Sequence, residues 1–172
     1  RQTERNQIFL TLYSVGFLVR SSNSKMLLWP NSPLLAMLQF VDPNERFGDE
    51  EYSFILLYNL ADLADAFDYS THENQLILAK QLIDRGANVN AVSIPTDETP
   101  LHRACLSAVV TNLDFVELLL LAGADPNAQD HMGLTPLMYT TRFAPGAAIF
   151  LMSWPTTDAN ITDRSGASFL LK

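Results

Sequence analysis

The sequence predicts an all-α fold of stacked helix–turn–helix repeats, separated by short hairpin turns. Three pairs of matching segments predict it: GANVN (86–90) with GADPN (123–127), TPLHRAC (99–105) with TPLMYTT (135–141), and DHMGLTPL (130–137) with DRSGASFL (163–170). The last pair is offset by 33 residues, and the others by slightly more. Self-similarity at a fixed period of this length is typical of a solenoid, in which each unit buries its apolar face against the next.

Two matching segments mark the start of a first helix in each repeat. Thr99 and Thr135 suit the N-cap position, where a hydroxyl accepts a bond from an unpaired backbone N–H. Pro100 and Pro136 then fall at the first helical position, where the missing N–H costs nothing and φ is already set. We therefore expect helices to begin at both Thr-Pro pairs.

A second helix in each repeat ends at a glycine. The run LLLL (118–121) is apolar almost all round, which predicts a helix covered by neighbours on more than one side. Gly86 and Gly123 follow such runs, and glycine most easily adopts the left-handed conformation that stops a helix. The next stretches are rich in Asn, Asp and Gly, which predicts hairpin-like turns leading to the next Thr-Pro pair.

Composition limits the function classes. The chain of 172 residues has a net charge of −8 and 48% hydrophobic residues, which suits a folded protein. Scattered Lys and Arg argue against nucleic acid as a partner, and the acidic balance argues against anionic membranes. One cysteine, Cys105, fits a reducing compartment. We expect an intracellular protein, cytoplasmic or nuclear, monomeric as an isolated segment and a part of a longer parent chain.

These repeats resemble the ankyrin repeat. The segments that carry the resemblance are TPLH (99–102), TPLM (135–138), GANVNA (86–91), GADPNA (123–128) and the weaker TTDANI (156–161). The resemblance implies an ankyrin-type solenoid with hairpin fingers, whose first helices line a concave binding surface. It also makes Asn127, with Asp125 and Leu119 before it, similar to asparagines that are hydroxylated in ankyrin proteins.

The resemblance divides the chain at residue 50. Residues 1–50 do not fit the period and are expected to form a non-repeat helical N-terminal cap, with a helix over 31–41. The array is expected over 51–172, as repeats at about 51–90, 91–127 and 128–160 and a partial one at 161–172. The second repeat contains an insertion around SAVVTNLD, and its finger over 91–98 has one extra residue.

Two residue groups are candidates for catalysis or metal binding. His102 and Cys105 lie three residues apart on one expected helix, the spacing of a possible Cys–His nucleophile pair. The resemblance instead gives His102 a structural role, hydrogen bonding between repeat starts, and Cys105 beside Ala104 suits a packed face. Asp62, Asp65 and Asp68 recur at three-residue spacing and suit a solvated helix face. The three histidines and one cysteine lack zinc-ligand spacing, so we predict no metal, no cofactor and no enzyme.

Aromatic and finger residues are the candidates for partner binding. Phe150 and Trp154 are assigned to core packing, and Tyr139 and Arg142 share a face of a first helix. Finger residues vary between copies of a fixed frame, so they can encode partner choice. Asp130 and Asp163 hold the same repeat position, and part of their expected role is to bridge neighbouring turns. The predicted contacts are Asp97, Glu98, Arg103, Asp130, His131, Met132, Tyr139, Arg142, Asp163 and Arg164.

Three functions follow from this interpretation. The first is non-catalytic binding of a protein partner of basic or mixed charge, through the fingers and the concave helix face. The alternative is a structural spacer or presenting scaffold for another domain, zinc-binding or catalytic, of a longer protein. The third, an enzyme using Cys105 and His102, requires a thiol that is reactive at neutral pH.

Overall fold

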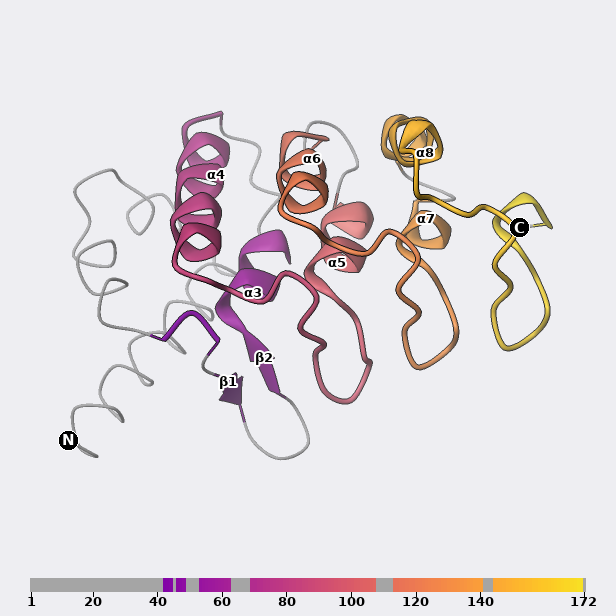
Figure 1. The fold of residues 1–172 in the computed structure, drawn as a ribbon, viewed down its shortest axis with the longest axis horizontal. Coiled ribbons are helices and arrows are strands. Elements are labelled where there is room, and N and C mark those ends of the chain that lie inside the picture. Colours follow the sequence, from indigo (N-terminus) through magenta and orange to yellow (C-terminus); the bar gives the residue numbers. More distant parts are fainter. Residues whose placement is uncertain are drawn as a thin grey trace.

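Two layers of helices and a row of hairpins make up the computed structural model, which describes residues 42–44, 46–48, 53–62, 69–107, 113–140 and 144–171. The elements are β1 (Arg46–Gly48), β2 (Ser53–Ile55), α3 (Leu56–Asp62), α4 (Tyr69–Asp84), α5 (Pro100–Ser107), α6 (Leu113–Leu121), α7 (Pro136–Tyr139), α8 (Pro145–Ser153) and the 3-10 helix η3 (Phe169–Leu171). The helices α3, α5 and α7 form the inner layer, and α4, α6 and α8 form the outer layer (Figure 1). This is the predicted helical solenoid.

The core lies between the two layers. Leu101, Phe115 and Leu119 are fully buried, and the apolar side chains of neighbouring repeats continue the same cluster along the stack. Burial of a Leu or Phe side chain contributes about 1.5–3 kcal/mol, so the contacts between repeats are the main source of stability. Among the described residues, no helix is long and apolar enough to cross a membrane.

The helix ends follow the glycine prediction. Gly86 and Gly123 have φ of +89° and +90°. The amide after each glycine donates back to the helix, from Ala87 to Leu82 O and from Ala124 to Leu119 O, both at 2.9 Å. These bonds satisfy carbonyls that the helix end would leave unpaired.

Only one of the two predicted threonine caps forms. The Thr99 hydroxyl accepts from His102 N at 3.4 Å, and His102 Nδ1 lies 2.8 Å from the same oxygen. Thr135 holds the N-cap position of α7 but makes no side-chain cap bond. The predicted N-cap position of Thr135 is therefore confirmed, and only its predicted side-chain bond is wrong. The residue that corresponds to His102 in α7 is Met138, which has no ring nitrogen to hold the hydroxyl in place.

One asparagine side chain joins each repeat to the next through two hydrogen bonds, and we call this pair of bonds a joint. Asn90 Nδ2 donates to Gly123 O at 3.0 Å, and Asn90 Oδ1 accepts from Asp125 N at 2.8 Å. The same pair of bonds joins Asn44 to Gly86 O and Asn88 N (2.9 and 2.6 Å), and Asn127 to Thr156 O and Asp158 N (2.7 and 2.8 Å). Asn127, the residue that resembles hydroxylated asparagines, is thus a joint residue.

The first joint lies inside the region that was expected to be a non-repeat cap. Residues 42–44 spell Asp-Pro-Asn, as residues 125–127 do, and Asn44 N donates to Asp42 Oδ1 as Asn127 N donates to Asp125 Oδ1, each at 2.9 Å. The hairpin β1–β2 follows this motif and crosses position 50, pairing Arg46 with Ile55. The repeated architecture therefore includes this hairpin. The helix expected over 31–41 lies outside the described residues.

Candidate protein-binding face

Four hairpin turns extend from the base of the inner helices, and we call them fingers 1 to 4. The paired strands β1 and β2 are the described part of finger 1, and fingers 2 to 4 comprise residues 91–98, 128–134 and 161–167. Backbone bonds close the last three: Ser93 N to Glu98 O (2.8 Å), Asp130 N to Leu134 O (3.0 Å) and Asp163 N to Ala167 O (3.0 Å). In Figure 1 the fingers lie on the same side of the stack, beyond the inner helices.

The two finger aspartates close their own turns. Asp130 Oδ1 accepts from Met132 N and Leu134 N, both at 2.8 Å. Asp163 Oδ1 accepts in the same way from Ser165 N and Ala167 N. The shared repeat position of Asp130 and Asp163 is confirmed. The bonds described here stay within one finger, so the role of the two aspartates in bridging neighbouring turns stays a prediction.

Finger 2 is one residue longer, which shifts two predicted residues out of register. Asp97 has φ of +55° and stands three residues before the helix proline, as Gly133 does with φ of +79°. Glu98 consequently takes the place of Leu134. The finger 2 residue that matches Asp130 is therefore Ser93, and neither Asp97 nor Glu98 holds this position.

Backbone and side-chain bonds tie the fingers side by side. Arg46 Nη2 donates to Val92 O at 2.7 Å, from finger 1 to finger 2. His131 N and Nδ1 both donate to Thr96 O, at 3.0 and 2.9 Å, from finger 3 to finger 2. Arg164 N donates to Met132 O at 3.1 Å, from finger 4 to finger 3.

Fingers 3 and 4 also touch at Gly133. A Cβ at this position would lie 2.9 Å from Arg164 N and 3.2 Å from the Cα of Asp163. Glycine is therefore required twice here, once for its positive φ and once for the close approach of the next finger.

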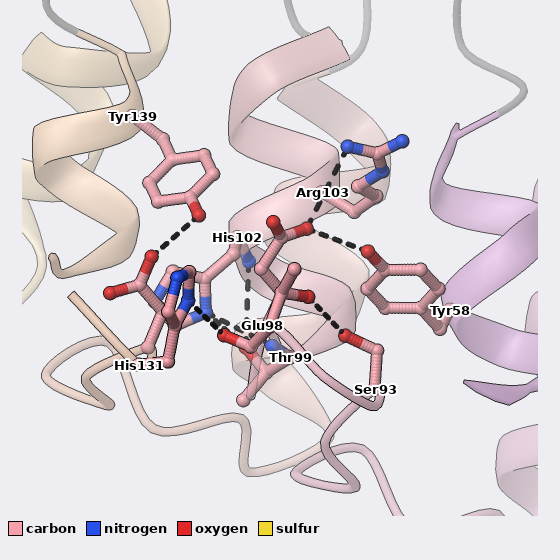
Figure 2. Close-up of polar contacts among 10 residues, drawn as sticks. Tyr58, Ser93, Glu98, Thr99, His102, Arg103, His131 and Tyr139 are labelled. Atoms are coloured by element: carbon pink, nitrogen blue, oxygen red, sulfur yellow. Dashed lines mark hydrogen bonds and ion pairs between the residues drawn. The ribbon is translucent and has the colours of Figure 1, made fainter. Parts of the chain in front are cut away.

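A buried acid connects the first two repeats at the base of finger 2 (Figure 2). Glu98 Oε2 accepts from Tyr58 OH at 2.6 Å and lies 3.6 Å from Arg103 Nη1. The Arg103 guanidinium also lies over the Tyr58 ring, 5.7 Å from its centroid. Burial, followed by the bond to Glu98, raises the pKa of Tyr58 to about 12. Tyr58 was not predicted as part of this network.

His102 connects the second and third repeats at the base of finger 3. Thr99 N–H can only donate, so His102 Nδ1 accepts this bond at 3.1 Å. The ring proton therefore resides on Nε2, which donates to Leu134 O at 3.0 Å. Burial lowers the pKa of His102, although the bond to Leu134 and the charges of Asp130 and Glu98 oppose this shift. The predicted structural role of His102 is confirmed.

Tyr58 and His102 occupy the same position in their repeats, one residue after the buried Leu57 and Leu101. Each contacts the residue of the next finger that stands directly before the helix-start threonine: Tyr58 contacts Glu98, before Thr99, and His102 contacts Leu134, before Thr135. We call these two contacts braces. The first brace uses a carboxylate side chain, whereas the second uses a backbone carbonyl.

Tyr139 belongs to the same buried network in the third repeat. Its hydroxyl donates to Asp130 Oδ2 at 2.8 Å, and its ring packs edge-on against His102 with centroids 5.1 Å apart. Burial raises the pKa of Tyr139 above its ordinary value. The half-buried Tyr139 thus fixes the base of finger 3 from within.

The predicted contact residues fall into two groups. Glu98 and Asp130 are buried, and Arg103 and Tyr139 are half-buried in the networks above. Asp97, His131, Met132 and Arg164 are exposed at the finger tips, with Asp163 half-buried beside them, and Arg142 lies outside the described residues. The exposed Val92 and Ile94 of finger 2 were not predicted; their alternation in AVSIPT is the signal that could have indicated them.

The possible nucleophile pair has the wrong environment for catalysis. Cys105 is fully buried, and burial raises the pKa of its thiol well above the ordinary value, which disfavours the reactive thiolate. Both ring nitrogens of His102 are bonded to Thr99 and Leu134. In the part of the chain that the structure describes, no group of three His, Cys, Asp or Glu residues could hold a metal ion; Asp65 and Asp68 lie outside that part.

The stacked helix pairs and their row of fingers define a class of protein, a repeat solenoid that presents hairpin tips on a fixed frame. A family model of ankyrin repeats, in three copies, matches residues 67–165. The chain belongs to the ankyrin repeat family. Ankyrin repeats generally mediate protein–protein interaction and are generally non-catalytic.

Curated relatives match part of the chain. It is 37% identical to human Rabankyrin-5 over 105 residues, which cover 55% of this chain and 9% of that protein. It is 46% identical to the Caenorhabditis elegans ankyrin repeat and LEM domain-containing protein 1 homolog over 57 residues, 33% of this chain and 8% of the relative. A putative ankyrin repeat protein of Acanthamoeba polyphaga mimivirus is 33% identical over 102 residues, covering 58% and 24%. The chain thus spans less than a quarter of each of these relatives.

Proposed function

We propose that this chain is a protein-binding module that contacts its partner through the finger tips and the concave face of α3, α5 and α7. The observation that supports this proposal most is the set of bonds that tie the fingers side by side. Asp97, His131, Met132 and Arg164 project from fingers whose backbones are held by the neighbouring fingers. A surface held in this way loses little conformational entropy on binding.

The exposed tips favour a partner of mixed character. Val92, Ile94 and Met132 expose 38%, 40% and 53% of their surface, which offers an apolar contact across fingers 2 and 3. Asp97 is exposed on finger 2 as well, and the chain as a whole has a net charge of −8. We propose a partner that presents apolar side chains together with basic ones, and an association rate that falls as salt is added.

Two finger substitutions and one matched control substitution test the proposed face. Ile94→Asp and Met132→Asp place a charge on the fingers, while Ile77→Asp places one on the outer helix α4 at a similar exposure of 45%. A photo-crosslinking residue at Met132 identifies the partner, and isothermal titration with the purified partner gives its dissociation constant. We expect each finger variant to weaken binding at least tenfold and Ile77→Asp to leave it unchanged.

The opposite result favours the alternative function. If both finger variants bind as tightly as the parent chain, the fingers are not the contact surface. A chain whose partners are all indifferent to the fingers and to the concave face would act as a spacer or presenting scaffold in a longer protein. Analytical ultracentrifugation of the segment tests the proposed monomeric state.

A further inference from the structure

His131 is an exposed finger residue whose side chain is nevertheless held in place. Its backbone N and its ring Nδ1 lie 3.0 and 2.9 Å from the same oxygen, Thr96 O. A carbonyl oxygen can only accept, so Nδ1 donates, and the proton of the neutral ring resides on Nδ1. His102 has the opposite tautomer, with its proton on Nε2.

The ring bond of His131 is not required to join one finger to the next. Arg164 holds the matching position in finger 4, and its backbone N donates to Met132 O at 3.1 Å without a ring nitrogen beside it. The bond from Nδ1 therefore serves to fix the orientation of the imidazole. An exposed side chain ordinarily loses rotamer freedom when a partner binds, and this ring has lost part of that freedom beforehand.

The other ring nitrogen of His131, Nε2, carries a lone pair and no proton. It lies on a different side of the ring from Nδ1, so it is directed away from the Thr96 carbonyl. None of the described residues bonds to it. Fingers 2 and 3, which the ring connects, carry the exposed aliphatic side chains Ile94 and Met132. A hydrogen-bond acceptor thus lies at the junction of two fingers with apolar tips.

This acceptor sets a condition on any partner that covers the finger tips. Apolar contact with Val92, Ile94 and Met132 excludes water, and an acceptor that loses water without gaining a donor costs free energy. A partner that supplies an N–H or O–H group at this place avoids that cost. A partner that presents only apolar atoms there binds about tenfold more weakly.

We propose, on the basis of the proposed function of the fingers, that His131 Nε2 accepts a hydrogen bond from an N–H or O–H group of the protein partner. This bond selects the partner and makes binding sensitive to mild acid. A proton on Nε2 turns the acceptor into a positively charged donor, so binding weakens as pH falls. Histidine is the side chain that ordinarily changes charge between pH 5 and 8.

Other titratable and charged groups lie on every element next to His131. They are Asp97 and Glu98 of finger 2, Asp130 of finger 3, Asp163 and Arg164 of finger 4, and His102 and Tyr139 of the inner helices. Carboxylates ordinarily titrate below pH 5, and tyrosine and arginine above pH 8. A change of binding between these two pH values is therefore expected from histidine.

Nitrogen-15 NMR of the histidine rings tests the acceptor without any partner. At pH 8 the ring of His131 should be the Nδ1–H tautomer, and His102 should be the Nε2–H tautomer as an internal reference. A proton on Nε2 of His131, or an average over both tautomers, would overturn the proposal, because no fixed acceptor would then face the partner.

Two substitutions separate the roles of the two ring nitrogens. His131→Asn keeps an N–H near the place of Nδ1 and removes Nε2, whereas His131→Gln carries its amide to the place of Nε2 and loses the bond to Thr96 O. The probe is the purified partner captured through the crosslinker at Met132. At pH 7.5, isothermal titration should show about tenfold weaker binding to His131→Asn and a smaller loss for His131→Gln. Urea denaturation should give His131→Asn the stability of the parent chain.

The pH profile is the measurement that a purely structural role of His131 would not change. Between pH 7.5 and 5.5 the dissociation constant of the parent chain should rise, by up to about tenfold per pH unit, and that of His131→Asn should rise less. His102 and the histidines of the partner are present in both experiments, so the difference between the two curves belongs to His131.

The outcomes distinguish this site from the finger face as a whole. Parallel pH curves, or equal binding of His131→Asn and the parent chain at pH 7.5, would overturn the role of Nε2 even where Ile94→Asp and Met132→Asp still weaken binding. If those two finger variants bind as the parent chain does, the proposed function of the fingers is wrong, and the role of Nε2 is wrong with it.

Discussion

The joints use one asparagine side chain at three successive junctions, whereas the braces use a different pair of groups each time. Asn44, Asn90 and Asn127 all bond a backbone carbonyl and a backbone amide of the next repeat. The braces join Tyr58 to a side chain and His102 to a backbone carbonyl. A side chain that bonds backbone groups meets the same carbonyl and amide whatever residue carries them. The same residue type can therefore make this contact at every junction. A contact between side chains can be rebuilt from other pairs.

The largest expected effect is at the second brace. His102→Ala removes a fully buried ring and leaves Leu134 O and the Thr99 amide without their bonds, so we expect the free energy of unfolding to fall by about 3 kcal/mol. Tyr58→Phe removes only the bond to Glu98 and should cost about 1 kcal/mol. Urea denaturation measures both. Equal losses would mean that the two braces are equivalent despite their different partners.

A smaller effect is expected where fingers 3 and 4 touch. Gly133→Ala meets both a positive φ and the backbone of Arg164, so it should destabilise the chain by about 2 kcal/mol. Gly86→Ala has a similar φ, but nothing lies within 4 Å of the new Cβ, so about 1 kcal/mol is expected. Thermal denaturation of the two variants isolates the contribution of finger contact. If Gly86→Ala lowers stability as much as Gly133→Ala does, the contact between fingers 3 and 4 contributes nothing measurable.

Acid should weaken the second brace before the first. Burial keeps the folded pKa of His102 below its ordinary 6.5, so the unfolded chain binds the proton first as pH falls. The contribution of neutral His102 is complete above pH 6.5 and decreases below it, by at most about 1.4 kcal/mol per pH unit. The free energy of unfolding of the parent chain should therefore fall more steeply than that of His102→Phe between pH 6.5 and 5. Parallel curves would contradict this assignment.

The smallest effect is expected at a single joint. Asn127→Ala removes two bonds from a partly exposed site, so we expect a loss of about 1 kcal/mol. Asn160→Ala is the matched control, because that side chain bonds Asp158 within its own repeat; a loss of about 0.5 kcal/mol or less is expected. Hydrogen exchange of the amides on either side of the joint should increase in Asn127→Ala. Unchanged exchange there would show that the joint does not hold the repeats together.

The contrast between joints and braces also explains what the sequence could predict. Gly86 and Gly123 predict where helices end, and the Thr-Pro pairs predict where helices begin. Backbone conformation restricts the residue type at each of these positions. The same letters could have indicated the first joint, since Asp-Pro-Asn at 42–44 repeats 125–127, but the absence of a Thr-Pro pair after it hid the match.

The brace of Tyr58 and Glu98 could not be predicted in this way. Its two residues are 40 positions apart, and no repeated sequence motif contains them both. Finger 2 contains one extra residue, which places Asp97 where Gly133 stands and moves Glu98 inward. Glu98, which was expected at the finger surface, is therefore buried, while Asp97 is exposed. Whether the other predicted contact residues are exposed depends on the direction in which each finger turn faces. That direction is set by the packing of neighbouring fingers.

The joint has a consequence for how such a chain can change over generations. Its partners are 42, 33 and 29 residues away in the three cases, so it tolerates helices and turns of different lengths between them. It also recognises only the main chain of the repeat that it holds. When a whole repeat is duplicated or deleted in the gene, the joint asparagine therefore still meets a backbone carbonyl and a backbone amide at the same position of the repeat that follows it. Arrays of this kind can lengthen or shorten without redesign of the contact between units.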